Sequence, residues 1–234
     1  MRTEILPEGH VWFRIAETGW ADPQGPDQVP TVDEMRQDLD AQTLPKNAGV
    51  PGGTASIFES VLSARDGACR RQLALDLGFD PTNAAVRGGR WNPPNSHPTL
   101  YLNEDRITAR LNLRMFIHGW PYEPEDLRND TGPVLVEATL PARQRVADVH
   151  SRQGLVAVKL PSTYPLDGKG LLVEHAVCQA IGVRAKTAGL RGVRARSARS
   201  PEGGRRELAW FPATRRSRAR AQAIQPFETW YWAY

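Results

Sequence analysis

This chain of 234 residues lacks several features that define familiar classes of protein. Its two cysteines, Cys69 and Cys178, stand far apart, with no Cys-x-x-Cys pair and no matching histidine spacing. That pattern predicts neither a disulfide framework nor a zinc site, so we expect no metal. No apolar run approaches the roughly 20 residues that cross a bilayer. The first ten residues also lack the apolar stretch of a signal peptide. We therefore expect a cytoplasmic protein without a membrane partner.

Lysine is also scarce, since only four of the 30 basic residues are lysines. Ten arginines fall within residues 191–220, and such a stretch could neutralise the phosphates of a nucleic acid. However, the net charge is only +4 and arginine replaces lysine along the whole chain. We therefore do not expect a nucleic-acid partner, although a basic nucleic-acid binder stays among the hypotheses.

The composition is that of a globular protein, with 40% hydrophobic and 24% charged residues. Apolar patterns and turn residues predict a mixture of helices and strands. We expect helices at about 31–43, 55–63, 67–77, 103–118 and 171–187, and strands at about 11–15, 99–102, 134–139, 144–149, 193–196, 206–211 and 224–232. Residues 151–168 are expected to be irregular. On the helix at 103–118, the stripe of Ile107, Leu111 and Met115 is expected to pack on the core.

The most informative segment runs Gly88-Gly89-Arg90-Trp91-Asn92-Pro93-Pro94. Two glycines permit a tight turn, and the Pro-Pro pair stiffens its exit. An arginine fork, an aromatic face and an amide on a rigid turn suit an anionic ligand that carries a ring. The strand at 99–102 then brings Tyr101 beside the turn. A purely structural turn anchored by Trp91 would have the same pattern.

This segment, followed by Tyr101-Leu-Asn-Glu-Asp105, resembles the core of the RES domain. Three further segments are similar to this family: Trp12-Phe-Arg-Ile15, Cys178-Gln-Ala-Ile-Gly182 with Gly189-Leu-Arg-Gly192, and Arg196-Ser-Ala-Arg199 with Arg206-Glu-Leu-Ala-Trp-Phe211. RES domains are the NAD+-consuming toxins of bacterial toxin–antitoxin pairs. The resemblance therefore implies an α+β, ADP-ribosyltransferase-like fold, with a split β-sheet core and flanking helices. Because Arg14 and Arg90 are unusually far apart, we expect a single domain over residues 1–234 with a helical insertion at about 21–82.

The activity implied by the resemblance is cleavage of the bond between nicotinamide and ribose in NAD+, by a phosphorylase, a glycohydrolase or an ADP-ribosyltransferase. Matching positions assign catalysis to Arg14, Tyr101 and Asn112. They assign binding of NAD+ to Arg14, Gly89, Arg90, Trp91, Asn92, Tyr101 and Ser197. Arginine suits the diphosphate because its planar fork meets two oxygens at once. For Arg14, an ion pair with a nearby acid such as Glu17 is the structural alternative.

The sequence departs from the family pattern at Asn112, where RES domains carry a glutamate eleven residues after the tyrosine. A carboxylate there would stabilise the cationic ribose that forms as the bond breaks, whereas an asparagine carries no charge. Glu104, Glu174 or Glu207 could supply a carboxylate instead, and the sequence does not decide among them. The alternative is a catalytically silent domain that binds NAD+ or a partner.

Two other residues of the late helix are expected to be structural: Gln179 holds a loop, and His175 is a satisfied helix residue rather than a base. RES toxins usually pair with a helix-turn-helix antitoxin, so such an antitoxin and a homodimer are the protein partners that the resemblance implies.

Overall fold

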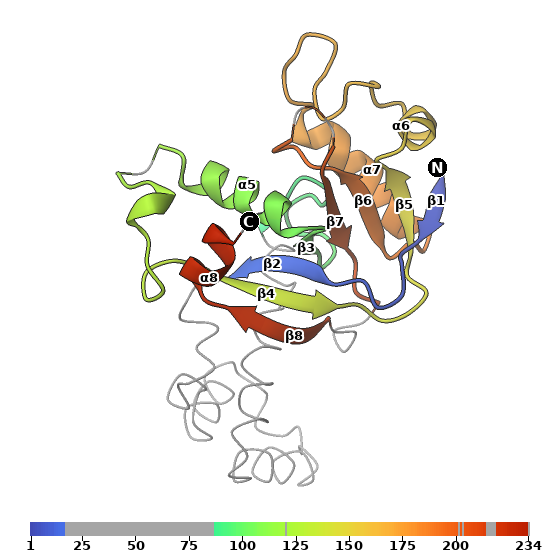
Figure 1. The fold of residues 1–234 in the computed structure, drawn as a ribbon. Helices are drawn as coiled ribbons and strands as arrows, with labels where there is room; N and C mark the ends of the chain where they lie inside the picture. The colour runs from blue at the N-terminus through green and yellow to red at the C-terminus, as the bar shows by residue number, and fades with distance from the viewer. Residues whose placement is uncertain (17–86, 120, 201, 203, 214–218, 234) are drawn as a thin grey trace, which may run out of the picture. The chain divides into compact units, whose positions relative to one another are not determined.

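The computed structural model describes residues 1–16, 87–119, 121–200, 202, 204–213 and 219–233 (Figure 1). The insertion expected at about 21–82, with its three helices, lies outside these residues.

One sheet of eight strands organises the described residues, in the order β1-β5-β6-β7-β3-β2-β4-β8. Its strands are β1 (Thr3–Ile5), β2 (Trp12–Ala16), β3 (Leu100–Asn103), β4 (Val134–Thr139), β5 (Arg145–Val149), β6 (Gly192–Arg196), β7 (Arg206–Trp210) and β8 (Arg220–Gln225). Neighbouring strands are antiparallel except β5 and β6, which are parallel. Together with the helices, this sheet confirms the α+β class.

The sheet is nearly split between β2 and β3, whose only register pair is Phe13 with Asn103. The same row of residues continues from Asn103 to Glu207 on β7 and then to Ala195 on β6. Residues paired directly across neighbouring strands share one face of the sheet. Phe13, Asn103, Glu207 and Ala195 therefore all lie on the same face.

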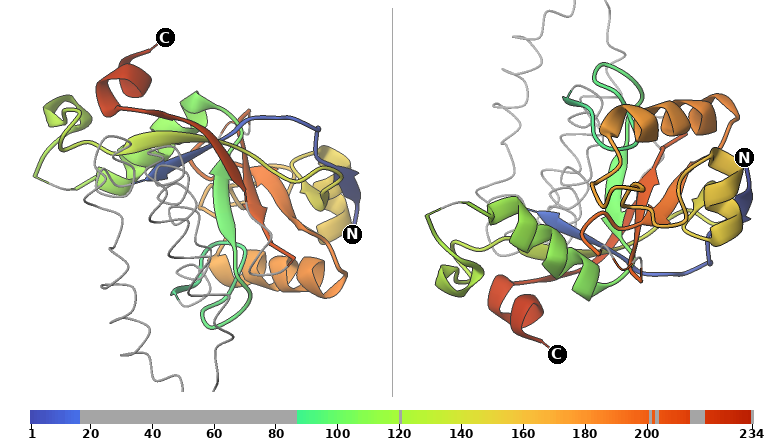
Figure 2. Two further views of the ribbon diagram at one scale, coloured as in Figure 1. Left: turned by 90° about the horizontal axis from the view of Figure 1, so that it is seen from below. Right: turned by 90° about the horizontal axis from the view of Figure 1, so that it is seen from above.

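That face is covered at its two ends by different helices (Figures 1 and 2). At one end, α5 (Arg106–Ile117) and α8 (Phe227–Trp232) pack with Phe13 and Leu135. At the other end, α6 (Arg152–Val158) and α7 (His175–Thr187) pack on β5, β6 and β7. A short 3-10 helix, η3, spans Pro124–Asp126. The side chains of Tyr101, Asn103 and Glu207 fall between the two hydrophobic clusters. Among the described residues, no helix has the length and apolar character needed to span a membrane.

Three expectations for single elements were wrong. Residues 227–232 form helix α8 rather than the end of a strand, because Pro226 begins a helix and Phe227, Trp230 and Tyr231 bury one face of it. Residues 152–158 form α6, which Ser151 caps through the Gly154 amide at 2.9 Å.

The third error concerns the face that α5 buries. Ile107 and Met115 are 45% and 46% exposed, whereas Ala109, Leu113 and Ile117 are buried. Both sets have i, i+4 spacing, so the periodicity alone cannot choose between them. In the structure, the helix turns the second set toward α8 and β2.

Candidate functional site

The Gly-Gly turn is built around the side chain of Tyr101. Gly88 has φ +73°, and a Cβ there would lie 2.7 Å from the nitrogen of Pro94. A Cβ on Gly89 would collide with the hydroxyl of Tyr101. Only glycines therefore allow the turn to close over this ring.

Tyr101 fastens the turn to β3 through both sides of its hydroxyl group. Its oxygen accepts a hydrogen bond from the Trp91 amide at 2.9 Å and donates one to Asn92 Oδ1 at 2.7 Å. Burial raises the pKa of this hydroxyl, so Tyr101 stays protonated at neutral pH. The structure thus gives Tyr101 a clear role in holding the turn in place.

Trp91 and Asn92 lie below the surface, at 2% and 0% exposure. Trp91 packs in the core against Tyr164, and its backbone carbonyl leaves no room for a Cβ on Gly182 of α7. Gln179 of the same helix donates to the carbonyl of Gly89 at 2.9 Å, so it holds the turn as expected. Trp91 and Asn92 therefore position the turn.

Arg90 projects from this turn toward the start of α7. Its Nη1 donates to the Val173 carbonyl at 3.0 Å and contacts Cys178 Sγ at 3.8 Å. Burial lowers the pKa of His175, and the positive charges of Arg90 and Arg199 lower it further. Hence the guanidinium groups of Arg90 and Arg199 both lie close enough to act on one imidazole. No carboxylate of the described residues lies within ion-pair distance of either arginine.

Ser197 is fully buried at the end of β6, where it organises a short loop. Its Oγ accepts a hydrogen bond from the Arg199 amide at 3.1 Å, and its hydroxyl bonds to the carboxylate of Glu207. Glu207 Oε1 also accepts the amide of Ala198 at 3.0 Å. Burial raises the pKa of Glu207, while these hydrogen bonds and the charges of Arg90 and Arg199 oppose the rise.

Arg14 approaches β3 by a different route. Strand alternation places its side chain on the face opposite Phe13 and Ile15. Its Nη1 nevertheless reaches the backbone carbonyl of Tyr101 at 3.4 Å, beside the place where β2 and β3 separate. Arg14 thus contacts the strand that carries Tyr101 through its backbone.

Asn112 lies on the side of α5 that faces β3. Its Nδ2 donates to Asn103 Oδ1 at 2.5 Å, and Asn103 in turn donates to the Phe13 carbonyl at 3.1 Å. Asn112 is therefore linked through Asn103 to the row of residues that contains Glu207, which lies on the neighbouring strand β7.

Sequence reasoning did not assign Arg199 to the site and left Glu207 as one of three candidate carboxylates. The structure joins both to Arg90, Tyr101 and Ser197 through hydrogen bonds and electrostatic interactions. Arg199 belongs to the segment that resembles the family, and its position two residues after Ser197 was the available signal.

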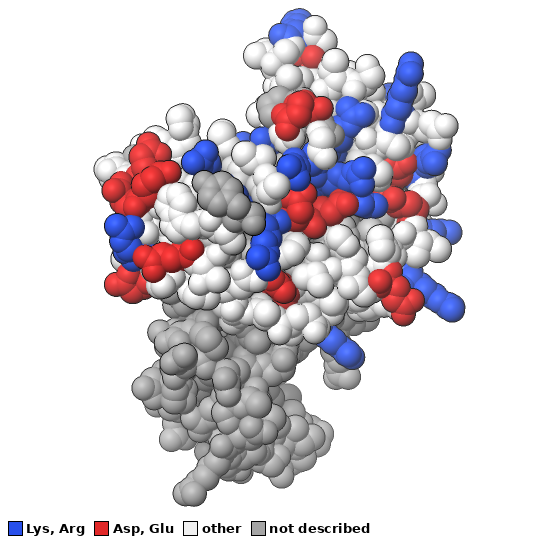
Figure 3. Space-filling model, viewed as in Figure 1, with Lys and Arg blue, Asp and Glu red and all other residues white. Residues whose placement is uncertain are grey.

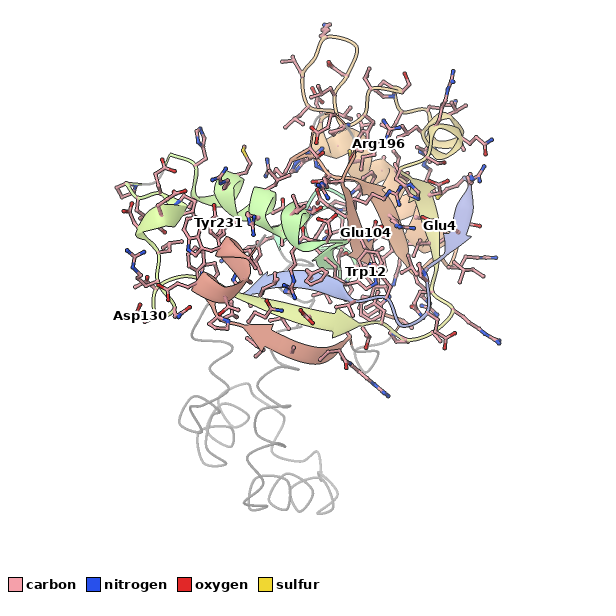
Figure 4. The ribbon with its side chains drawn as sticks, viewed as in Figure 1. Glu4, Trp12, Glu104, Asp130, Arg196 and Tyr231 are labelled. Carbon is pink, nitrogen blue, oxygen red and sulfur yellow. The ribbon has the colours of Figure 1, made fainter. Side chains whose placement is uncertain are left out.

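The opposite face of the sheet carries charges that neutralise one another. Arg194 pairs with Glu104 at 2.6 Å and with Glu4 at 3.1 Å, and Arg206 contacts Glu104 at 3.5 Å. The two glutamates are labelled in Figure 4. Acidic and basic side chains are interspersed over the face seen in Figure 3, rather than gathered into one basic patch. Glu104 is therefore engaged in ion pairs away from Tyr101.

Glu4, Asp148 and His150 place their ligand atoms within 4.8 Å of one another. However, Arg194 pairs with Glu4, and Arg2 pairs with Asp148 at 3.0 Å. Cationic partners thus already balance both carboxylates.

Comparisons with known proteins agree with this architecture. The chain is similar in structure to a chain of the M. tuberculosis MbcT–MbcA toxin–antitoxin complex, with a TM-score of 0.51 and 20% sequence identity. The similarity covers 65% of this chain and 81% of that one, and the fold is ADP-ribosyltransferase-like. No curated protein matches in sequence. The sequence model of the RES domain matches residues 68–233, which is most of the chain and includes the turn, β3, α7 and the serine segment; the chain therefore belongs to the RES domain family.

Proposed function

We propose that this protein is a RES-type toxin that cleaves NAD+ at the bond between nicotinamide and ribose. The observation that carries the proposal is the group formed by Arg90, Arg199, Tyr101, Ser197 and Glu207, whose arginines and carboxylate have no ion-pair partner among the described residues. Half-buried charges without a salt-bridge partner are typical of sites that bind a charged ligand. Membership of the RES domain family supports NAD+ as that ligand.

In the proposed reaction, the C1′–N bond breaks and its electron pair moves to the nicotinamide nitrogen, which becomes neutral. The ribose carries the positive charge until an oxygen of water, phosphate or a protein side chain bonds to C1′ and releases its proton. The protein must bind the diphosphate, hold the nicotinamide and stabilise the cationic sugar.

Arg90 and Arg199 suit the diphosphate, because the charges of both guanidinium groups act on the same imidazole, that of His175. Gly89, Trp91 and Asn92 position Arg90, and Tyr101 holds this turn on β3 through its hydroxyl group. Ser197 holds the loop that carries Arg199 and bonds to the carboxylate of Glu207 on β7. Arg14 contacts the backbone of β3 at the split of the sheet, from the face opposite Glu207, so its proposed part in binding NAD+ rests on the family pattern alone.

The decisive experiment is to incubate the pure protein with NAD+, with and without phosphate, and to identify the products by mass spectrometry. The proposal predicts free nicotinamide together with ADP-ribose, or with ADP-ribose 1″-phosphate when phosphate is the acceptor. NAD+ that stays intact over hours under both conditions contradicts it.

A catalytically silent RES domain is the second candidate, and Asn112 is the observation that favours it. Asn112 hydrogen-bonds Asn103 and carries no charge. A silent domain would bind NAD+ in a calorimeter without turnover and would gain activity in the Asn112→Glu variant.

An antitoxin is the proposed protein partner, and the similarity in fold to a chain of a toxin–antitoxin complex supports it. A helix-turn-helix antitoxin, a homodimer and a cytoplasmic location are proposed on the family resemblance. Co-expression with an adjacent small open reading frame, followed by size-exclusion chromatography, tests the partner.

A further inference from the structure

We propose that Glu207 supplies the carboxylate that stabilises the ribosyl cation, in place of the glutamate that the RES pattern puts at position 112. This inference rests on the proposed cleavage of NAD+. It assigns to β7 a role that the family pattern gives to α5.

The first argument is position. Asn103 receives the hydrogen bond of Asn112 and is paired directly with Glu207 across β3 and β7. Side chains paired in this way lie on one face, with Cβ atoms about 5 Å apart. Glu207 is therefore a single strand spacing from Asn103, the residue that Asn112 contacts, and it lies on the face of the sheet that also carries Tyr101.

The second argument compares the three carboxylates that could take the role. Glu104 is occupied by Arg194 and Arg206 on the opposite face of the sheet. Glu174 precedes α7 as an exposed residue that makes no side-chain capping bond. Glu207 is partly buried, and its charge acts on the hydroxyl of Tyr101. Of the three, Glu207 is the one that is partly buried and whose carboxylate accepts the amide of Ala198, next to Arg199.

The third argument is the way in which Glu207 is held. The amide of Ala198 and the hydroxyl of Ser197 both bond to its carboxylate. These bonds fix the direction of the carboxylate and lower its pKa, although burial is the larger effect and raises the pKa of Glu207 overall. Arg90 and Arg199 attract it without forming an ion pair. A fixed negative charge of this kind stabilises a cation most strongly where water is excluded.

Chemically, Glu207 needs to exchange no proton. The C1′–N bond breaks with its electron pair going to nicotinamide, and the carboxylate stabilises the positive charge on the ribose. When water adds at C1′, its proton passes to the solvent. The ionised carboxylate is unchanged at the end of the cycle.

The test uses the full chain with NAD+ as the probe. Glu207→Gln keeps the shape of the side chain and removes the charge, so we expect kcat to fall on the order of 100-fold while the calorimetric Kd for NAD+ changes little. Glu125→Gln, which removes an exposed carboxylate on η3, is the matched control and should leave kcat unchanged. A folded Glu207→Gln variant with wild-type kcat overturns the inference and leaves NAD+ cleavage standing.

The Asn112→Glu variant provides a second test that does not depend on the folding of Glu207→Gln. If Glu207 already supplies the carboxylate, a second one at position 112 brings no gain in kcat. A gain on the order of 100-fold would mean that the native site lacks a carboxylate, and would overturn the inference. A wild-type protein that binds NAD+ but releases no nicotinamide contradicts the proposed cleavage itself, which separates the two failures.

Discussion

Two sets of charged residues lie back to back across the middle of the sheet. On one face, Glu104 and Arg206 belong to a network of ion pairs. On the other face, Glu207 and the nearby Arg90 have no ion-pair partner among the residues that the structure describes. Arg206 and Glu207 are consecutive in the sequence, so a single step along β7 separates the two sets.

The difference indicates what each set does. A buried charge that already forms an ion pair is largely neutralised by its partner, so it interacts only weakly with a charged ligand. Half-buried charges without an ion-pair partner can still interact with a ligand, and each of them adds to the binding of a ligand with complementary charge. The ion-paired face is therefore interpreted as scaffold and the other face as the binding site.

The largest expected effect tests the unpaired set. Arg90→Ala should lower kcat/KM for NAD+ on the order of 100-fold, because the variant loses a guanidinium group that is proposed to bind the diphosphate. Steady-state kinetics with a nicotinamide assay measures it. Arg184→Ala, on an exposed position of α7, serves as the control. An Arg90→Ala variant with full turnover would break the comparison, because the unpaired charges would then have no role in the reaction.

A smaller effect is expected from the paired set, and it should appear in stability instead. Glu104→Gln leaves Arg194 without its shortest ion pair, and both side chains are largely buried. We expect the free energy of unfolding to fall by about 2 kcal/mol, with kcat/KM unchanged.

Urea titrations of folded variants measure this loss, and the pair of Arg205 with Asp105, which is more accessible to solvent, gives the reference. Arg205→Gln should cost less than about 1 kcal/mol, because solvent screens that pair. If Glu104→Gln instead lowers kcat/KM and leaves the free energy of unfolding unchanged, the interpretation of the ion-paired face as scaffold is wrong.

The local part of this site could be predicted from the sequence. Gly88 and Gly89 mark a turn, and the buried strand after it brings Tyr101 back to that turn. These contacts join residues that lie within about a dozen positions of each other, so spacing and turn chemistry specify them.

The part that the sequence could not give depends on contacts between distant strands. Alternation shows that Arg206 and Glu207 face opposite sides, but it does not show which of them faces Tyr101. That choice depends on the pairing of β7 with β3 and β6, and the partners on β3 and β7 lie more than 100 residues apart in the chain. For the same reason, the sequence could group Arg14 with Arg90 by motif, but it could not show that Arg14 meets β3 at its backbone.

The smallest expected effect concerns pH and the segment between the turn and β3. Burial lowers the pKa of His97 to about 4, with a further contribution from Lys186. Its Nε2 is buried without a hydrogen-bond partner among the described residues, and its ring packs in a T-shaped arrangement with the ring of Phe211, with the centroids 4.5 Å apart. The folded protein therefore holds His97 neutral at pH values where the unfolded chain is already protonated.

As the pH falls, His97 is protonated in the unfolded chain before it is protonated in the folded protein. The contribution of neutral His97 to stability is therefore present above pH 6.5 and is lost as the pH falls toward 4. Urea unfolding at pH 7, 6, 5 and 4.5 should give a shallower dependence for His97→Phe than for the wild-type protein. Parallel curves would show that His97 protonates equally easily in the folded and unfolded states, and would contradict the prediction.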